Sequence, residues 1–326
     1  MKSIEPHTDT AIERNVRAFL KAVNSSGGPP MEHMSPKDAR AVLVKAQASV
    51  DLVLPTCDIS EKTITQSGLT IKLTIVRPAG VTSMLPVFMF FHGGGWVLGD
   101  FPTHERFVRD LVVGSGAAAV FVNYTSSPEA QYPVAINEAY AATKWVSEHG
   151  AEINVDGNRL AVAGNSVGGN MATVVCLMAK KNQGPRIALQ LLLWPVTNAN
   201  FETESYSQYA EGRFLSRNMM KWFWYNYTVD TSQRAEIYAS PLRATAEQLK
   251  GLPPAFIQTA ENDVLRDEGE TYARNLDAAG VDVVAVRYTG MIHDWCLLNA
   301  LSHVPANRAA LCHASSALKK HLMARD

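Results

Sequence analysis

One short stretch, RLAVAGNSVGGNMATVVCLM at residues 159–178, constrains the fold of this chain more than any other. It starts as an apolar run typical of a buried strand and continues as a helix of small and apolar residues. Between the two stands Gly164-Asn165-Ser166-Val167-Gly168, a G-x-S-x-G pattern. Between a strand and a helix this pattern indicates a nucleophile elbow, a strained turn that exposes its serine hydroxyl at the carboxyl edge of a sheet.

The glycines of this pattern have a steric purpose, because strand and helix can pass closely only where side chains are missing. The helix then directs its first backbone amides and its positive dipole end toward Ser166. The N–H of Val167 becomes available to a developing oxyanion. The pentapeptide is weak evidence by itself, since a chain of this length should contain about 0.1 such matches by accident. The rest of the chain has to supply the chemical partners.

Strands and helices alternate along most of the chain. Two alternating runs separated by Ser67-Gly68 predict an antiparallel hairpin. Further strands are expected at 85–91, 117–124, 159–164, 188–196, 253–260 and 281–288, and helices at 8–23, 35–50, 103–114, 133–150, 168–181, 267–280 and 304–322. This order predicts an α/β fold with a mostly parallel central sheet and helices on both faces. The alternation stops at 199–237, a segment dense in aromatic residues.

Composition excludes several classes of function. The chain has 326 residues, of which 47% are hydrophobic and 19% charged, and a formal net charge of −1. This balance provides no electrostatic basis for binding nucleic acid. Neither the cysteine spacing nor His104-Glu105, which lacks the second histidine of HExxH, indicates a metal, so we expect no cofactor. No signal peptide and no apolar run long enough to span a membrane are visible, which predicts a cytoplasmic protein.

Ser166 requires a base and an acid, which follow an elbow serine in the order Asp or Glu, then His. Among the histidines after Ser166, only His293 is expected in a loop directly after a strand, at the same sheet edge. The acid should follow the preceding strand, where Asp263 is preferred and Glu261 is the alternative. Its carboxylate would orient the imidazole and stabilise the imidazolium.

The run His92-Gly93-Gly94-Gly95-Trp96 directly follows the strand expected at 85–91. An HGGG-type loop in this place supplies oxyanion donors, because glycines let backbone N–H groups approach a substrate oxygen. A phosphate-binding glycine loop is excluded, since Leu98 stands where the dinucleotide fingerprint needs glycine.

Together HGGGW (92–96), GNSVGG (164–169), DVLRDEG (263–269) and HDW (293–295) resemble the hormone-sensitive-lipase-like family of α/β-hydrolase carboxylesterases. The likeness covers roughly residues 60–322. It implies an α/β-hydrolase fold with a helical cap and no cofactor. By this resemblance the catalytic residues are Ser166, Asp263 and His293, and the oxyanion-hole amides are those of Gly94, Gly95 and Val167.

The resemblance also implies a division of the chain. An N-terminal helical cap region would cover 1–55, a catalytic domain 56–198 and 238–326, and a cap insertion 199–237. In the family the two cap segments roof the substrate pocket, so some of the aromatic residues at 206–227 should line it. We expect four residues to contribute to substrate binding: Gly93, Trp96, Asn165 and Trp222.

The chain departs from the family pattern beside the nucleophile. Asn165 stands where the family usually has an acidic residue, and Val167 where it usually has alanine. YTSSPE at 124–129 replaces a YRLAPE-like stretch, and Val264 replaces a proline. None of these changes removes a reacting group. We hypothesise that Val167 narrows the pocket and alters acyl or enantiomer preference.

The sequence therefore predicts a serine carboxylesterase that acts on small, fairly apolar esters through an acyl-enzyme. An amidase or deacetylase would use the same residues. A non-catalytic binding protein of the same fold is the alternative from another class, although such a protein should have lost a triad member. The last strand is expected at an exposed sheet edge, and pairing of two such edges would form a homodimer.

Overall fold

The computed structural model describes residues 5–323. Its eight strands are β1 Cys57–Gln66, β2 Leu69–Pro78, β3 Leu85–Phe91, β4 Ala118–Asn123, β5 Val155–Asn165, β6 Gln190–Leu193, β7 Ala255–Asn262 and β8 Val283–Ile292. Its α-helices are α1 Arg14–Asn24, α2 Pro36–Ala48, α3 Phe101–Ser115, α4 Val134–His149, α5 Val167–Lys181, α6 Glu204–Gln208, α7 Arg217–Tyr227, α8 Thr231–Arg234, α9 Ala246–Leu249, α10 Arg266–Ala278 and α11 Pro305–Met323.

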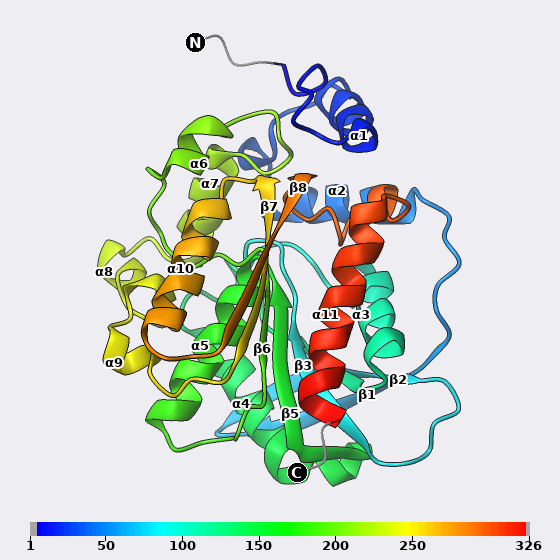
Figure 1. Cartoon of the computed structure of the whole chain (residues 1–326), viewed down its shortest axis with the longest axis vertical. Helices are drawn as coiled ribbons and strands as arrows, with labels where there is room; N and C mark the ends of the chain where they lie inside the picture. Colours follow the sequence, from blue (N-terminus) through cyan, green and yellow to red (C-terminus); the bar gives the residue numbers. More distant parts are fainter. Residues whose placement is uncertain (1–4, 324–326) are drawn as a thin grey trace.

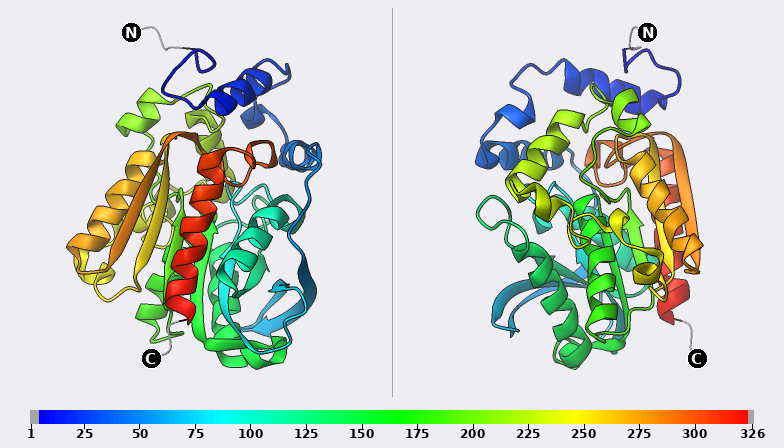
Figure 2. Two further views of the ribbon diagram at one scale, coloured as in Figure 1. Left: turned by 45° about the vertical axis from the view of Figure 1, so that its right-hand side comes forward. Right: turned by 90° about the vertical axis from the view of Figure 1, so that its left-hand side faces the viewer.

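All eight strands form one sheet in the order β1-β2-β4-β3-β5-β6-β7-β8. The hairpin of β1 and β2 is antiparallel, β2 is antiparallel to β4, and the other pairs are parallel. Helices α3 and α11 cover one face, while α4, α5 and α10 cover the other (Figures 1 and 2). The predicted mostly parallel α/β sheet is confirmed.

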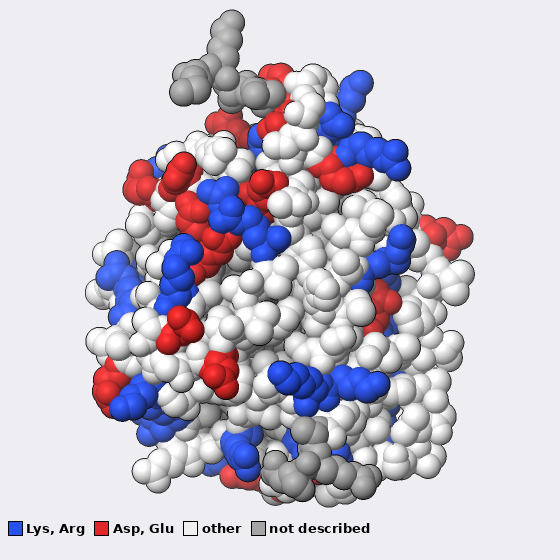
Figure 3. Space-filling model, in the orientation of Figure 1, with Lys and Arg blue, Asp and Glu red and all other residues white. Residues whose placement is uncertain are grey.

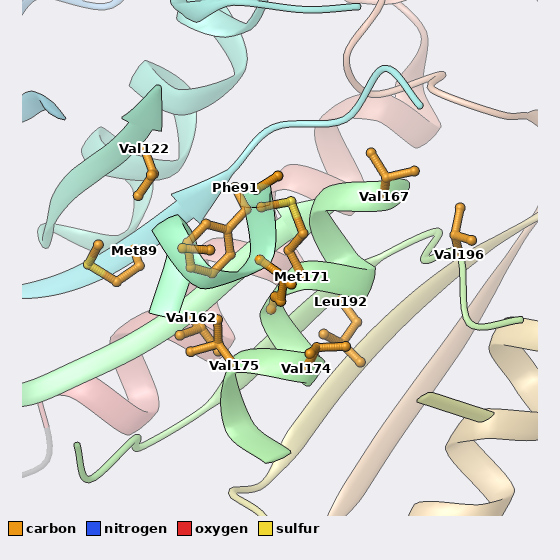
Figure 4. Close-up of a cluster of buried hydrophobic side chains, with 14 of the residues drawn as sticks. Met89, Phe91, Val122, Val162, Val167, Met171, Val174, Val175, Leu192 and Val196 are labelled. Atoms are coloured by element: carbon orange, nitrogen blue, oxygen red, sulfur yellow. The ribbon is translucent and has the colours of Figure 1, made fainter. Parts of the chain in front are cut away.

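The central strands are buried on both faces, which explains their continuous apolar sequences. In β3 the side chains of Phe88 and Phe90 join the hydrophobic cluster beneath α3 and α11, whereas Met89 and Phe91 join the cluster beneath α4 and α5. Figure 4 shows members of the second cluster packed between the sheet and α5: Met89, Phe91, Val162, Met171, Val174, Val175 and Leu192.

Most element bounds differ from the expected ones; for example, β5 begins at Val155 and β8 ends at Ile292. Two of the differences have a local explanation. Strand β6 ends at Leu193, since Trp194 leaves the extended conformation with a φ of 40°. Helix α1 begins at Arg14 because the carboxylate of Glu13 accepts hydrogen bonds from the N–H groups of Asn15 and Val16. Helix α2 begins as predicted, with the Ser35 side chain accepting from Asp38 N–H.

Helices α1, α2, α6 and α7 lie beyond the carboxyl ends of the parallel strands (Figures 1 and 2). The division of the chain into cap segments and a catalytic domain stays a prediction. The outermost positions of that division, 1–4 and 324–326, lie outside the described residues.

Within residues 5–323, no helix combines the length and the apolar character that crossing a membrane requires. On the face drawn in Figure 3, acidic and basic side chains are intermixed.

Candidate active site

The pairing of neighbouring strands brings the predicted site residues to one edge of the sheet. Phe91 lies opposite Gly164 in the β3–β5 pair, so the glycine loop after β3 starts beside the serine turn after β5. Asn262 lies opposite Ile292 in the β7–β8 pair, so Asp263 and His293 follow paired residues. Strand register therefore explains why the two loops within each pair start side by side.

Ser166 occupies the strained turn between β5 and α5, with φ 55° and ψ −120°. A methyl group on Gly164 would lie 2.2 Å from the carbonyl oxygen of Gly168, and one on Gly168 would lie 1.9 Å from that of Phe91. Only glycine fits at either position. A non-glycine residue at such a φ costs about 1–3 kcal/mol, which the surrounding packing must offset. The expected nucleophile elbow is therefore present in the structure.

The structure brings Ser166, Asp263 and His293 into one hydrogen-bonded chain. Nε2 of His293 lies 3.0 Å from Ser166 Oγ, and Nδ1 lies 2.7 Å from Asp263 Oδ2. All three residues are buried, with exposed fractions of 4%, 1% and 3% respectively. A carboxylate at Nδ1 favours the tautomer that carries its proton there, which leaves Nε2 free to accept the serine proton. The arrangement can activate a hydroxyl nucleophile.

The carboxylates around His293 decide its protonation. Burial by itself would lower the pKa of His293, but the charges of Asp263 and Asp294 outweigh it and raise the pKa above the ordinary 6.5. A raised pKa means that the imidazolium is stabilised in the folded protein. This is the species that forms when the imidazole accepts a proton from serine.

The glycine loop presents free backbone N–H groups beside Ser166. The N–H of Gly93 is already used, because it donates to Asn165 Oδ1 at 2.9 Å. Within residues 5–323, the N–H groups of Gly94, Gly95 and Val167 donate to no protein acceptor. Gly94 and Gly95 have φ values of 103° and 64°, which glycine adopts readily. Three backbone donors without a protein acceptor thus lie in the glycine loop and at the start of α5.

The rings of Tyr124 and His104 pack against His92 at the start of this loop. His92 stacks on Tyr124 with ring centroids 4.1 Å apart, and Tyr124 Oη donates to the His92 carbonyl oxygen at 3.0 Å. Burial lowers the pKa of His92 to about 4, so its imidazole is neutral near pH 7. His104 lies against His92, and burial lowers its pKa as well. In the described part of the chain, no three or more His, Cys, Asp or Glu side chains form a group that could hold a metal ion.

The residues expected to bind substrate lie in different surroundings. Trp96 is fully buried and stacks on Tyr227 at 3.9 Å, and Asn165 is fully buried beneath the glycine loop. Trp222 is partly exposed on α7. Its neighbour Phe223 covers the glycine loop directly, because a methyl group on Gly95 would lie 2.0 Å from the ring. Phe223 is therefore one of the α7 aromatic residues in contact with the glycine loop, as is Tyr227 through Trp96.

One polar residue of the site, Asp294, was not predicted from the sequence to take part in it. Asp294 Oδ1 accepts hydrogen bonds from Trp194 Nε1 at 2.7 Å and from Asn165 Nδ2 at 3.2 Å. Its Oδ2 lies 3.8 Å from His293 Nε2. Asp294 was visible beside His293, but no local pattern shows that segments ending at 165, 194 and 294 meet.

Glu261, the alternative acid, points elsewhere. Its carboxylate accepts a hydrogen bond from the N–H of Gly290 at 2.7 Å, while Asp263 is the acid hydrogen-bonded to His293 Nδ1.

Comparison with known proteins places this geometry among ester hydrolases. The profile of a family described as alpha/beta hydrolase fold matches residues 88–297. The carboxylesterase NlhH of Mycobacterium tuberculosis is 39% identical over 289 residues, which are 88% of this chain and 89% of that protein. An ethyl acetate hydrolase of Pseudomonas putida is 28% identical over 321 residues, 96% of this chain and 100% of that protein. The crystal structure of a thermostable esterase from Pseudomonas putida ECU1011 is 65% identical, covers 97% of this chain and 99% of its own, and superposes with a TM-score of 0.96.

Proposed function

Because this chain belongs to the hormone-sensitive-lipase-like family of α/β-hydrolases and is a carboxylic ester hydrolase, we propose that Ser166, Asp263 and His293 hydrolyse small, fairly apolar esters through an acyl-enzyme. The observation that carries this proposal is the buried chain of contacts from Asp263 through His293 to Ser166 Oγ, at 2.7 and 3.0 Å.

The reaction follows from the position of each group. His293 Nε2 takes the proton of Ser166 as Oγ attacks the ester carbonyl carbon. The amides of Gly94, Gly95 and Val167 donate to the oxyanion of the tetrahedral intermediate. The intermediate collapses as His293 protonates the leaving alcohol, and the acyl group stays on Oγ. Water then attacks the acyl-enzyme with His293 as base, which releases the acid and restores Ser166.

The surroundings of Ser166 support a preference for small, apolar substrates. Ser166 is only 4% exposed, and the oxyanion loop lies under the ring of Phe223. Trp222 and Phe223 on α7 have ring centroids 5.2 Å apart and extend this aromatic surface. The relative named ethyl acetate hydrolase carries a small, neutral ester in its name. Such a surface favours an uncharged acyl group over a charged one.

Hydrolysis of p-nitrophenyl esters from acetyl to dodecanoyl, measured for the wild type and for Ser166→Ala, tests the proposal. We expect activity that is highest on short chains and is lost in the variant. A p-nitrophenyl phosphonate should label Ser166 stoichiometrically, as detected by peptide mass. The p-nitroanilide of the best acyl group distinguishes an amidase, which would hydrolyse it at a comparable rate. Turnover that survives in Ser166→Ala would refute the assigned nucleophile.

A further inference from the structure

Helix α2 comes from the N-terminal segment, outside the central sheet, yet it contacts two loops of the site. Two of its polar side chains, Arg40 and Gln47, are seven residues apart. Two turns of an α-helix separate such residues, so both lie on the same face. The opposite face is exposed and includes Val42 and Lys45. The first face is the one that meets the catalytic machinery.

Arg40 binds the backbone of the glycine loop that follows β3. Its Nε donates to the carbonyl oxygen of Val97 at 2.7 Å. The N–H of the same Val97 donates to the carbonyl oxygen of Gly94 at 3.1 Å, so Arg40 contacts the turn that presents the free amides. The Arg40 guanidinium also donates to the Ser127 carbonyl oxygen at 2.9 Å and to both carboxylate oxygens of Glu129. The planar guanidinium of Arg40 thus connects helix α2 to the turn at residues 94–97 and to the 124–129 segment.

Gln47 binds the backbone of the loop that follows His293. Its side chain is buried, with Nε2 donating to the carbonyl oxygen of Leu297 at 3.1 Å and Oε1 accepting from the N–H of Asn299 at 3.0 Å. The Asn299 side chain returns a hydrogen bond to the Gln47 carbonyl oxygen at 3.0 Å. Arg106 of α3 also donates to the Leu297 carbonyl oxygen, at 2.7 Å. The histidine loop is therefore held from both α2 and α3.

We propose that α2 is a positioning element for the reaction: Arg40 places the oxyanion amides, and Gln47 places His293. This inference rests on the proposed function of the site. The two side chains touch no reacting atom and act only through the loops they bind. Positioning matters at this scale, because a displacement of about 1 Å in a catalytic group can cost about 100-fold in rate.

The two side chains should affect different properties of the enzyme. Arg40 acts on donors whose hydrogen bonds strengthen as negative charge develops, so its loss should lower kcat more than it raises KM. Gln47 acts on the base, so its loss should also move the acidic limb of the pH profile of kcat/KM. A helix that only stabilised the fold would produce neither signature.

Four variants separate positioning from folding: Arg40→Ala, Arg40→Lys, Gln47→Met and the control Lys45→Ala. Lys45 is an exposed cation on the opposite face of the same helix. Methionine fills the space of Gln47 without its hydrogen bonds. Active sites are counted by phosphonate titration, so that kcat refers only to folded enzyme, and p-nitrophenyl acetate is the substrate.

We expect Arg40→Ala to lower kcat about ten-fold or more with KM within about two-fold. Millimolar guanidinium should restore part of the activity of Arg40→Ala. Arg40→Lys should stay impaired, since one ammonium cannot bind two carbonyls and a carboxylate in the fork geometry. Gln47→Met should lower kcat/KM and shift its acidic limb, while Lys45→Ala matches the wild type.

Variants of Arg40 and Gln47 whose kcat per titrated site equals that of Lys45→Ala would overturn the inference. So would a kcat loss in Arg40→Ala that guanidinium leaves unchanged and that Arg40→Lys repairs, because charge alone would then suffice. These failures are distinct from failure of the proposed function, which would show as wild-type turnover independent of Ser166.

Discussion

Replacing Asn165 with aspartate would place a second carboxylate against Asp294. Asn165 is fully buried, and its two amide atoms have different partners. Oδ1 accepts from the N–H of Gly93 at 2.9 Å, and Nδ2 donates to Asp294 Oδ1 at 3.2 Å. Asn165→Asp keeps the acceptor for Gly93 and exchanges the donor for a negative oxygen. The asparagine thus suits this chain because Asp294 already supplies the negative charge.

The cost of this substitution follows from the distance. Two unit charges 3.2 Å apart repel by about 5 kcal/mol at an effective dielectric constant of about 20. The lost hydrogen bond to the charged group would add about 1.5–3 kcal/mol. Asp294 is 13% exposed in its side chain, so side-chain movement and solvent relieve part of this energy. We expect the free energy of unfolding to fall by about 3–5 kcal/mol at pH 8.

The loss of stability caused by Asn165→Asp should increase as the pH rises. Protonation of the new carboxyl removes the repulsion and restores a donor, so the folded variant holds this proton more tightly than the unfolded chain does. Stability relative to the wild type must then decrease as the pH rises above about 4, where the carboxyl ionises in the unfolded state. Near pH 4 and below, the difference should be small.

Urea unfolding of the wild type and Asn165→Asp at pH 5 and pH 8 measures this effect. The same substitution in an Asp294→Asn background should cost less by at least about 2 kcal/mol at pH 8, because the second charge is absent. A variant as stable as the wild type at pH 8, or an equal cost in both backgrounds, would refute the electrostatic reasoning.

Three further predictions concern the pocket, the base and the sheet edge. Val167→Ala should change the relative kcat/KM among p-nitrophenyl esters of different acyl length; an identical profile would contradict a role for Val167 in selectivity. Because Asp263 and Asp294 raise the pKa of His293, kcat/KM should fall as the pH drops through a value above 6.5, and an acidic limb below that value would contradict the raised pKa. Strand β8 is an edge of the sheet, and Val284 on it is 54% exposed. If β8 pairs across a dimer, sedimentation of the wild type gives a dimer and Val284→Lys gives a monomer, whereas a wild-type monomer excludes the pairing.

Much of the fold was readable from the sequence because its causes are local. The continuous apolar run of β3 reflects burial on both faces, and Ser67 and Gly68 both adopt the positive φ that a two-residue hairpin turn needs. The elbow was readable for the same reason, since the steric demands on Gly164 and Gly168 arise within a few residues of Ser166. Chain order and strand ends then placed His293 and Asp263 at one sheet edge.

The remaining features depend on contacts between segments far apart in the chain, which no local pattern records. Only strand register and packing decide that Asp263 meets His293 while Glu261 binds the N–H of Gly290. Strand β6 ends at Leu193, and the next residue, Trp194, donates its indole N–H to Asp294.

The sequence by itself determined the alternating α/β order, the elbow and the glycine loop, since periodicity and glycine sterics act over a few residues. Tertiary structure alone decided how these parts are held. Asn165 and Trp194 both bind Asp294, and Arg40 reaches the oxyanion turn from a helix near the N-terminus. Such contacts have a physical cause that only appears in space: a buried polar group must find its partner wherever the fold brings one within about 3 Å.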